Sequence, residues 1–216
     1  MSGISAPIFG NRDKSSSYVQ YMTHHAQLDE TLEGLVEFGA PVAASNTDLR
    51  ASTAIAAGAR QNFTTQLVVA ALCGRSVNIT VTGAGVVTLF GRDYLNQPIS
   101  QAVTFAGVGT TPTTKAFKYL DGISCTTAIS ISLGNGPTLG LPIVTGVALQ
   151  EILNGGAAAA LGTLTAPDLT TPATTTTGDP RGRYTPNSTM NGTNLIAVKC
   201  RFRDDTADGM HGVPQV

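Results

Sequence analysis

Apolar and polar residues alternate along much of the chain, with the period of two that is typical of half-buried β-strands. Ser76–Thr82 places Val77, Ile79 and Val81 on one face and its polar residues on the other. Leu195–Arg203 repeats the pattern, with Ile196, Val198, Cys200 and Phe202 facing one way. Further strands are expected at Gln66–Leu72, Val86–Phe90, Ile99–Phe105, Lys115–Leu120, Ile123–Leu133 and Leu141–Leu153.

Short turn sequences separate these strands. Gly83–Gly85, Asp121–Gly122 and Gly134–Pro137 contain the residues favoured in tight turns, and Asp-Gly is a strong hairpin signal. Strands that recur about every ten residues indicate an antiparallel sandwich or barrel. No alternation of strands and helices typical of a parallel sheet is visible. The pattern therefore predicts an all-β fold.

The N-terminal region follows a different pattern. Leu28, Leu32, Leu35 and Val36 recur at helical spacing, and Gly39 with Pro41 would end the helix, so the spacing predicts a short amphipathic helix over 25–38. We divide the chain into four regions: an extended N-terminal arm (1–60), a β-sandwich core (61–160), an extended Thr/Pro-rich excursion (161–190), and a closing strand with a C-terminal tail (191–216). The arm includes this helix and a stretch of small residues (40–59) that we expect to lie over another surface.

Composition narrows the classes of function. Only 12% of the 216 residues are charged, about half of the usual share, as is common where another protein covers part of a surface, although an ordinary β-domain is an alternative. The formal net charge of −1 and scattered basic residues predict no nucleic-acid binding. We expect neither a signal peptide nor a membrane span. Cys73, Cys125 and Cys200 are widely spaced and are expected to be buried free thiols.

Arg92, Asp93 and Tyr94 are the strongest candidates for catalysis. They are residue types that position an anion and transfer a proton, and they interrupt two expected strands. Gly91 and Asp93 are also turn formers, and neither a histidine nor a second carboxylate lies in the adjoining strands to complete an acid–base pair. We interpret this segment as the corner of a sheet.

Metal and cofactor sites are also not expected. His24 and His25 diverge on a helix and offer with Asp29 at most two ligands, and His211 lies in the tail. The cysteines lack the close pairing of a metal or redox motif. Glycine-rich stretches at Gly107–Gly109 and Gly134–Gly136 lack the lysine of a phosphate-binding loop. The spacing of the remaining candidate acids matches no calcium loop; these are Asp168, Asp179, Asp204, Asp205 and Asp208. We therefore expect that the protein is not an enzyme and that it binds neither a cofactor nor a small-molecule substrate.

Three stretches resemble tailed-bacteriophage virion proteins. The first is VVTLFGRDYLNQPISQAVTFAGVGTTPTTKAFKYLDGIS (86–124), in which a strand ends in G-x-D-x-x-x-x-P and K-A-F-K precedes a return strand. The second, TTTTGDPRGRYTPN (174–187), is similar to a T-G-D-x-R-G-x-Y-x-P segment of those proteins, and the third is the closing strand and tail, NLIAVKCRFRDDTADGMHGVPQV (194–216). Together they cover about a third of the chain, whereas residues 1–60 match no pattern of the family.

The resemblance implies a structural virion protein, most like a capsid decoration (cement) protein with a β-sandwich or jelly-roll domain. Its expected partners are the major capsid protein and copies of itself, as a dimer or a trimer. Its expected location is the capsid surface of a virion assembled in the cytoplasm of a host bacterium. A tail or baseplate component is an alternative, and a glycan-binding surface module is another, although the chain contains no Trp for sugar stacking.

Overall fold

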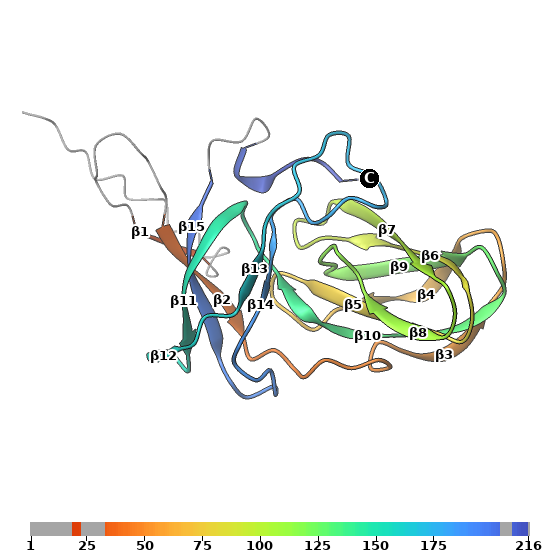
Figure 1. Ribbon diagram of the computed structural model, residues 1–216, viewed down its shortest axis with the longest axis horizontal. Coiled ribbons are helices and arrows are strands. Elements are labelled where there is room, and N and C mark those ends of the chain that lie inside the picture. Colours follow the sequence, from red (N-terminus) through yellow and green to blue (C-terminus); the bar gives the residue numbers. More distant parts are fainter. Residues whose placement is uncertain (1–18, 23–32, 204–208, 216) are drawn as a thin grey trace, which may run out of the picture.

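The computed structural model describes residues 19–22, 33–203 and 209–215, and its regular elements are almost all β-strands. Every pairing between two strands is antiparallel. The helical residues within the described ranges form one short 3₁₀ turn, η1 (Gly209–His211). The prediction of an all-β antiparallel fold is confirmed, and Figure 1 shows how the sheets are arranged.

Two sheets form the larger part of the molecule. The first sheet contains, in spatial order, β3 (Arg50–Ile55), β10 (Ile129–Gly140), β5 (Arg75–Val81) and β8 (Gly109–Pro112). The second sheet contains β4 (Gln61–Val68), β9 (Tyr119–Cys125), β6 (Gly85–Arg92) and β7 (Pro98–Phe105). Two short strands, β14 (Arg183–Thr185) and β13 (Thr163–Thr165), extend the first sheet beyond the second half of β10.

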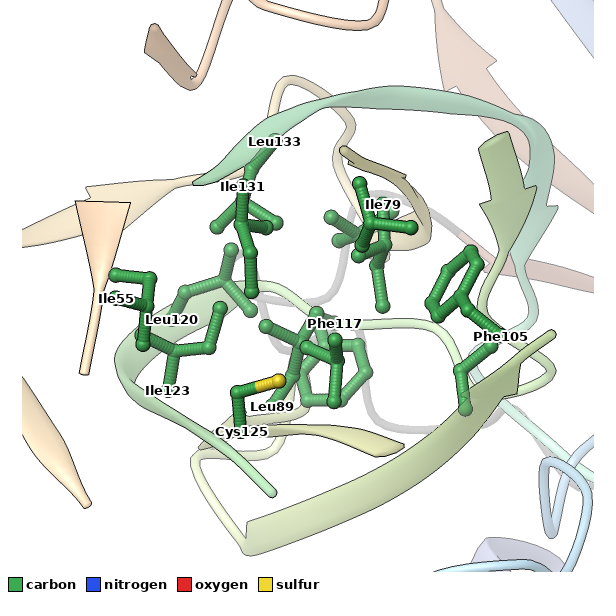
Figure 2. Packing of buried hydrophobic residues seen from close by; sticks show 14 of the residues in the cluster. Ile55, Ile79, Leu89, Phe105, Phe117, Leu120, Ile123, Cys125, Ile131 and Leu133 are labelled. Atoms are coloured by element: carbon green, nitrogen blue, oxygen red, sulfur yellow. The ribbon is translucent and has the colours of Figure 1, made fainter. Parts of the chain in front are cut away.

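A hydrophobic core fills the space between these two sheets. The alternation in β5 directs Val77, Ile79 and Val81 into it, and Ile131 on β10 lies beside them. Leu89 on β6 faces them from the second sheet and is fully buried (Figure 2). Strands with one apolar face each bury that face against the other sheet, which is the basis of sandwich packing.

A third sheet brings together strands from the N-terminal and C-terminal parts of the sequence. Its order is β1 (Val19–Met22), β2 (Glu33–Gly39), β15 (Ile196–Phe202), β11 (Thr145–Leu153) and β12 (Ala157–Ala159). Val36, Phe38 and Val198 belong to a second hydrophobic cluster, which also contains Leu139 from the far end of β10 and Tyr184 from β14. One long strand, β10, therefore contributes to both clusters.

The helix predicted over 25–38 is wrong for its second half, where residues 33–38 belong to strand β2. Residues 25–32 lie outside the described residues. In β2, Gly34, Val36 and Phe38 are buried and alternate with more exposed positions, which is a period of two. Pairing with β15 decides the outcome, because it buries Val36 beside Val198 and places Glu33 beside Lys199.

Two of the predicted turns lie inside strands. Asp121 and Gly122 belong to β9, and residues 134–137 belong to β10. A Cβ atom at position 122 would lie 2.8 Å from the carbonyl oxygen of Gln61, so this glycine permits the close approach of β4 instead of making a turn. The register between β10 and β5 shifts between Asn135 and Leu139, and this irregularity accommodates Pro137 within the strand.

Two segments expected to lie outside the packed core contribute to it. Within residues 40–59, β3 pairs with β10 and buries Ile55. Within residues 161–190, Asp179, Arg181 and Tyr184 are buried, and β14 pairs with β10. Threonine and proline composition indicates an extended chain, but it does not reveal the few large side chains that anchor the segment to the sheets.

Candidate functional site

The segment Arg92–Tyr94 ends β6 and begins the tight connection to β7. The N–H of Asp93 donates to the carbonyl oxygen of Gln97 (3.0 Å), and the N–H of Asn96 donates to that of Asp93 (3.1 Å). Asn96 adopts a left-handed conformation (φ 64°), which asparagine tolerates in turns. The N–H of Gln97 donates to Oδ1 of Asp93 (2.9 Å). This carboxylate therefore holds its own turn closed.

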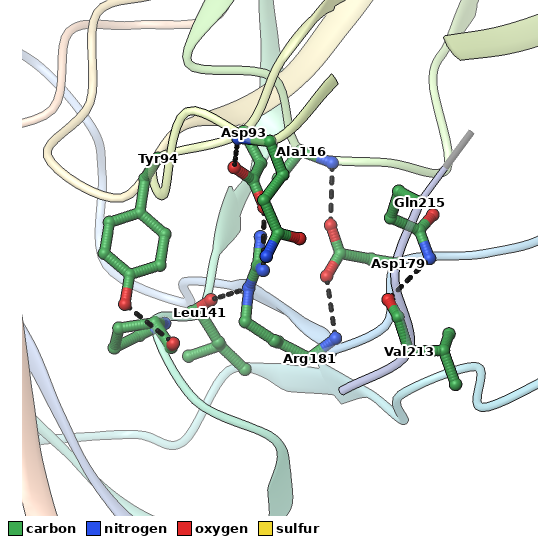
Figure 3. A network of polar contacts seen from close by, with 10 residues as sticks. Asp93, Tyr94, Ala116, Leu141, Asp179, Arg181, Val213 and Gln215 are labelled. Carbon is green, nitrogen blue, oxygen red and sulfur yellow. Dashed lines mark hydrogen bonds and ion pairs between the residues drawn. The ribbon is translucent and has the colours of Figure 1, made fainter. Parts of the chain in front are cut away.

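The other carboxylate oxygen of Asp93 faces Arg181. Oδ2 lies 2.8 Å from Nη1 of Arg181, and the exposed fraction of the two side chains is 1% and 2%. Nε of Arg181 donates to the carbonyl oxygen of Leu141 (3.1 Å), and its guanidinium lies 5.3 Å from the ring centre of Tyr94. The Tyr94 hydroxyl donates to the carbonyl oxygen of Pro142 (2.9 Å). Figure 3 shows these contacts around one buried cation.

A second carboxylate, Asp179, lies on the other side of Arg181 (Figure 3). Its Oδ2 accepts from the N–H of Ala116 (2.9 Å) and its Oδ1 from the N–H of Arg181 (3.0 Å). Burial raises the pKa of Asp179 against the opposing effect of Arg181. Burial lowers the pKa of Arg181, but Asp179 and Asp93 outweigh it and raise that pKa above its usual range. The cation is thus held in its charged form.

Lys115 adds a buried amine to the same region. Its side chain is fully buried, and Nζ donates to the carbonyl oxygen of Thr174 (2.8 Å). Burial lowers the pKa of Lys115 to about 8, although Asp179 and Asp168 act in the opposite direction. A nearby contact joins the same segments, because Nη1 of Arg183 donates to the carbonyl oxygen of Thr113 (3.0 Å). We call Asp93, Lys115, Asp179 and Arg181 the ionic cluster.

The ionic cluster joins segments that are far apart in sequence. It connects the turn after β6, the segment before β9 and the segment before β14. Its carboxylates are occupied by backbone N–H groups and by Arg181, and its side chains are buried. A substrate would have to displace these partners to reach a reactive group. The arrangement therefore serves as a structural joint.

A second polar anchor holds the segment after β14. The hydroxyl of Tyr184 donates to Oε2 of the buried Glu151 (2.6 Å), and the N–H groups of Asn187 and Ser188 donate to the same carboxylate (2.9 and 2.8 Å). Burial raises the pKa of Glu151, but these hydrogen bonds outweigh it and lower that pKa below its usual value. Phe38 stacks on the Tyr184 ring at 6.0 Å between centroids. The anchor thus connects β2, β11 and β14.

The three cysteines are free and buried, as expected from their spacing. Burial raises the pKa of Cys73 to about 11 and that of Cys200 to about 12. A thiolate is the reactive form, so these thiols are poor nucleophiles at neutral pH.

The remaining candidates do not converge. Within the described ranges, no group of three or more His, Cys, Asp or Glu side chains is placed to hold a metal ion. His211 is exposed in η1, whereas His24, His25, Asp29 and residues 204–208 lie outside those ranges. No helix among the described residues is long and apolar enough to span a membrane.

A shallow surface hollow lies over β4. Its lining includes Arg50, Asn62, Phe63 and Thr64. The guanidinium of Arg50 lies 4.8 Å from the centre of the Phe63 ring. Arg50 thus covers the aromatic face on which a flat ligand would stack.

Comparisons of the chain with models of known protein families, with curated proteins and with solved structures found no match. The sequence analysis identified Asp93 as a turn former but did not identify Arg181 as its partner or Lys115 as a member of the ionic cluster. Only 12% of the residues are charged, so a charged residue inside an otherwise uncharged segment was the one available sign of a side chain buried in an ion pair.

Proposed function

We propose that the protein is a structural component of a bacteriophage particle that binds the outer surface of the capsid and bridges neighbouring capsomers. One observation carries the proposal. The first two stretches that resemble tailed-phage virion proteins supply the whole ionic cluster: Asp93 and Lys115 come from residues 86–124, and Asp179 and Arg181 from residues 174–187. The similar residues are thus spatial neighbours, as expected when a resemblance reflects a shared structural unit.

The order of the strands supports a more specific fold assignment. Numbered from β3 to β10, the first, eighth, third and sixth strands form one sheet, and the second, seventh, fourth and fifth form the other. This is the order of a jelly roll, the double-sheet fold found in viral capsid and lectin domains. We assign the two-sheet part of the molecule to this fold. A fold alone does not establish a function, so the assignment supports the virion role only together with the resemblance.

The chemistry of the surface is consistent with binding to another protein. Exposed apolar side chains occur at Val42, Val68, Val108 and Leu195. Many copies on a repeating lattice bind by avidity, so each contact can be weak and no deep pocket is needed. The partner in this proposal is the major capsid protein, and the location is the virion surface after assembly in the bacterial cytoplasm.

Immunogold labelling of purified phage particles with an antibody against this chain tests the proposal. Label distributed over the head is the expected result. Label confined to the tail or baseplate would replace the proposal with the tail alternative. Particles that carry no label, and in which mass spectrometry detects no peptide of this chain, would overturn both. As a control, particles from a phage in which the gene is deleted must lose the label. If the protein stabilises the shell, these particles should also release their DNA at a lower temperature.

A further inference from the structure

Asparagine is followed by glycine at three places in the sequence: Asn135–Gly136, Asn154–Gly155 and Asn191–Gly192. Glycine has no side chain, so its backbone nitrogen can approach Cγ of the preceding asparagine and displace the side-chain nitrogen as ammonia. This reaction requires an accessible side-chain amide and a backbone N–H that is free to lose its proton. The three pairs share one dipeptide, but the structure gives each of them a different environment.

Asn135 is protected by burial. Its exposed fraction is 2%, and both ends of its side-chain amide are occupied. Oδ1 accepts from the N–H of Ala70 (3.0 Å), and Nδ2 donates to Oδ2 of Asp48. Movement of this side chain toward the backbone of Gly136 would break both contacts.

Asn191 is exposed, but the nitrogen that would attack it is occupied. The N–H of Gly192 donates to the carbonyl oxygen of Pro41 (3.0 Å). Oδ1 of Asn191 accepts from the N–H groups of Thr193 and Asn194 (2.9 and 2.8 Å), which fixes the side chain within its own turn. Ring closure at this pair would first have to break the contact with Pro41.

Asn154 meets both requirements. It follows β11 and begins the turn to β12, the last strand of the third sheet (Figure 1). Asn154 and Gly155 are exposed, and no residue in the described ranges accepts a hydrogen bond from the N–H of Gly155. Oδ1 of Asn154 accepts from the N–H of Leu195 (3.0 Å). A donor on this oxygen stabilises the negative charge that develops there when Cγ is attacked.

Ring closure also requires the turn to open. Asn154 has a left-handed conformation (φ 51°), and its N–H donates to the carbonyl oxygen of Leu195 (2.8 Å). β12 opposes the opening with only three paired residues, of which Ala157 and Ala158 are exposed. Segments with few buried contacts open locally at a low cost in free energy.

We propose that Asn154 is a site of spontaneous deamidation in the folded protein. The backbone nitrogen of Gly155 loses its proton to hydroxide and forms a bond to Cγ of Asn154. The bond between Cγ and Nδ2 breaks, and Nδ2 takes a proton from water and leaves as ammonia. Water then opens the resulting succinimide ring. Cleavage of the new bond at Cγ gives aspartate, and cleavage at the backbone carbonyl carbon gives isoaspartate.

The modification changes the charge and the contacts of this turn. Either product adds one negative charge to a chain whose formal net charge is −1. Isoaspartate also lengthens the backbone by one carbon atom, which displaces the groups that contact Leu195. The hairpin of β11 and β12 thereby loses its connection to the residue that precedes β15, and amide hydrogen exchange at Leu195 should become faster.

Incubation of the full chain in mildly alkaline buffer, followed by digestion in acid and mass spectrometry, measures deamidation at each pair separately. In the native protein, Asn154 should react first, and Asn135 and Asn191 at least about tenfold more slowly. In urea the three rates should converge, because the unfolded chain exposes the same dipeptide three times. Asn154→Gln should abolish the early reaction, since the longer side chain does not close the succinimide ring. Asn191→Gln is the matched control and should leave the early reaction unchanged.

An intact Asn154 in the native protein, after the chain in urea has reacted at all three pairs, would overturn the proposal. Equal native rates at the three pairs would also overturn it, because the fold would then not select among them. The experiment needs no capsid and does not depend on the proposed virion role. Its outcome is therefore separate from that of the labelling experiment.

Discussion

Arg181 and Asp93 form an ion pair of 2.8 Å between two side chains that are almost completely buried. The nearby carboxylate of Asp179 also raises the pKa of Arg181. Nε of Arg181 donates to the carbonyl oxygen of Leu141. A buried charge costs free energy unless partners compensate it. The pair therefore makes the contact between the turn after β6 and the segment before β14 specific.

Replacement of the cation leaves the carboxylates uncompensated. Arg181→Met is expected to lower the free energy of unfolding by about 3–5 kcal/mol, the range for breaking a buried ion pair. Urea unfolding followed by circular dichroism measures the change. Arg92→Met is the control, because its pair with Asp121 (3.3 Å) is partly exposed and should contribute at most about 1 kcal/mol. Equal losses in the two variants would contradict the assigned role of Arg181.

The buried amine of Lys115 predicts a dependence of stability on pH. Its pKa is lowered from 10.5 to about 8 by burial, so between these values the unfolded chain binds more protons than the folded one. The free energy of unfolding should therefore rise with pH across this window, by about 2–3 kcal/mol. Because other groups titrate there too, the measured quantity is the difference between the natural protein and Lys115→Met in urea unfolding from pH 7 to 10.5. A difference that is constant with pH would refute the prediction.

The carboxylate of Glu151 should control the segment after β14. It accepts the N–H groups of Asn187 and Ser188 as well as the Tyr184 hydroxyl. Glu151→Ala should speed amide hydrogen exchange at residues 187 and 188 and cost about 3 kcal/mol, whereas Tyr184→Phe should cost about 1–2 kcal/mol. The lowered pKa of Glu151 means that its contribution is present above the ordinary glutamate pKa and is lost as the pH falls through the lowered value. Unchanged exchange at both amides would show that the anchor is elsewhere.

Thiol labelling tests the burial of the cysteines. The native protein should react with a thiol reagent at pH 8 at least about 100-fold more slowly than the denatured chain, because burial limits access and raises the pKa of Cys73 and Cys200. Thr53→Cys provides the positive control, since this position on β3 is exposed. Rapid labelling of a native cysteine would indicate that its part of the core opens.

The local sequence pattern predicted the strands in which apolar and polar residues alternate cleanly. Arg75–Val81 and Ile196–Phe202 agree closely with the expected segments, because each has one apolar face that a neighbouring layer covers. The strand Glu33–Gly39 was not predicted, since leucines at 28, 32 and 35 fit a helical period equally well and only pairing with β15 selects the strand. Competition of this kind between local preference and tertiary pairing is not visible in a single sequence.

The ionic cluster illustrates the same limit. Turn chemistry at Asp93 was readable, because Gly, Asp and Asn favour such connections and the residues do form one. Its partner Arg181 lies in a Thr/Pro-rich segment whose composition indicates an extended path. Asp93 and Arg181 come together in the folded chain, in which β14 pairs with β10. No rule about spacing along the sequence reveals this contact between distant segments.

Strand β10 gives Ile131 and Leu133 to one hydrophobic cluster and Leu139 to the other. If either hydrophobic cluster melts, one end of β10 is released, and the other cluster loses part of the strand pairing that supports it. Heat or force that disrupts the third sheet is thus transmitted directly to the sandwich. The molecule should lose its structure in one cooperative step, and two separate transitions are not expected.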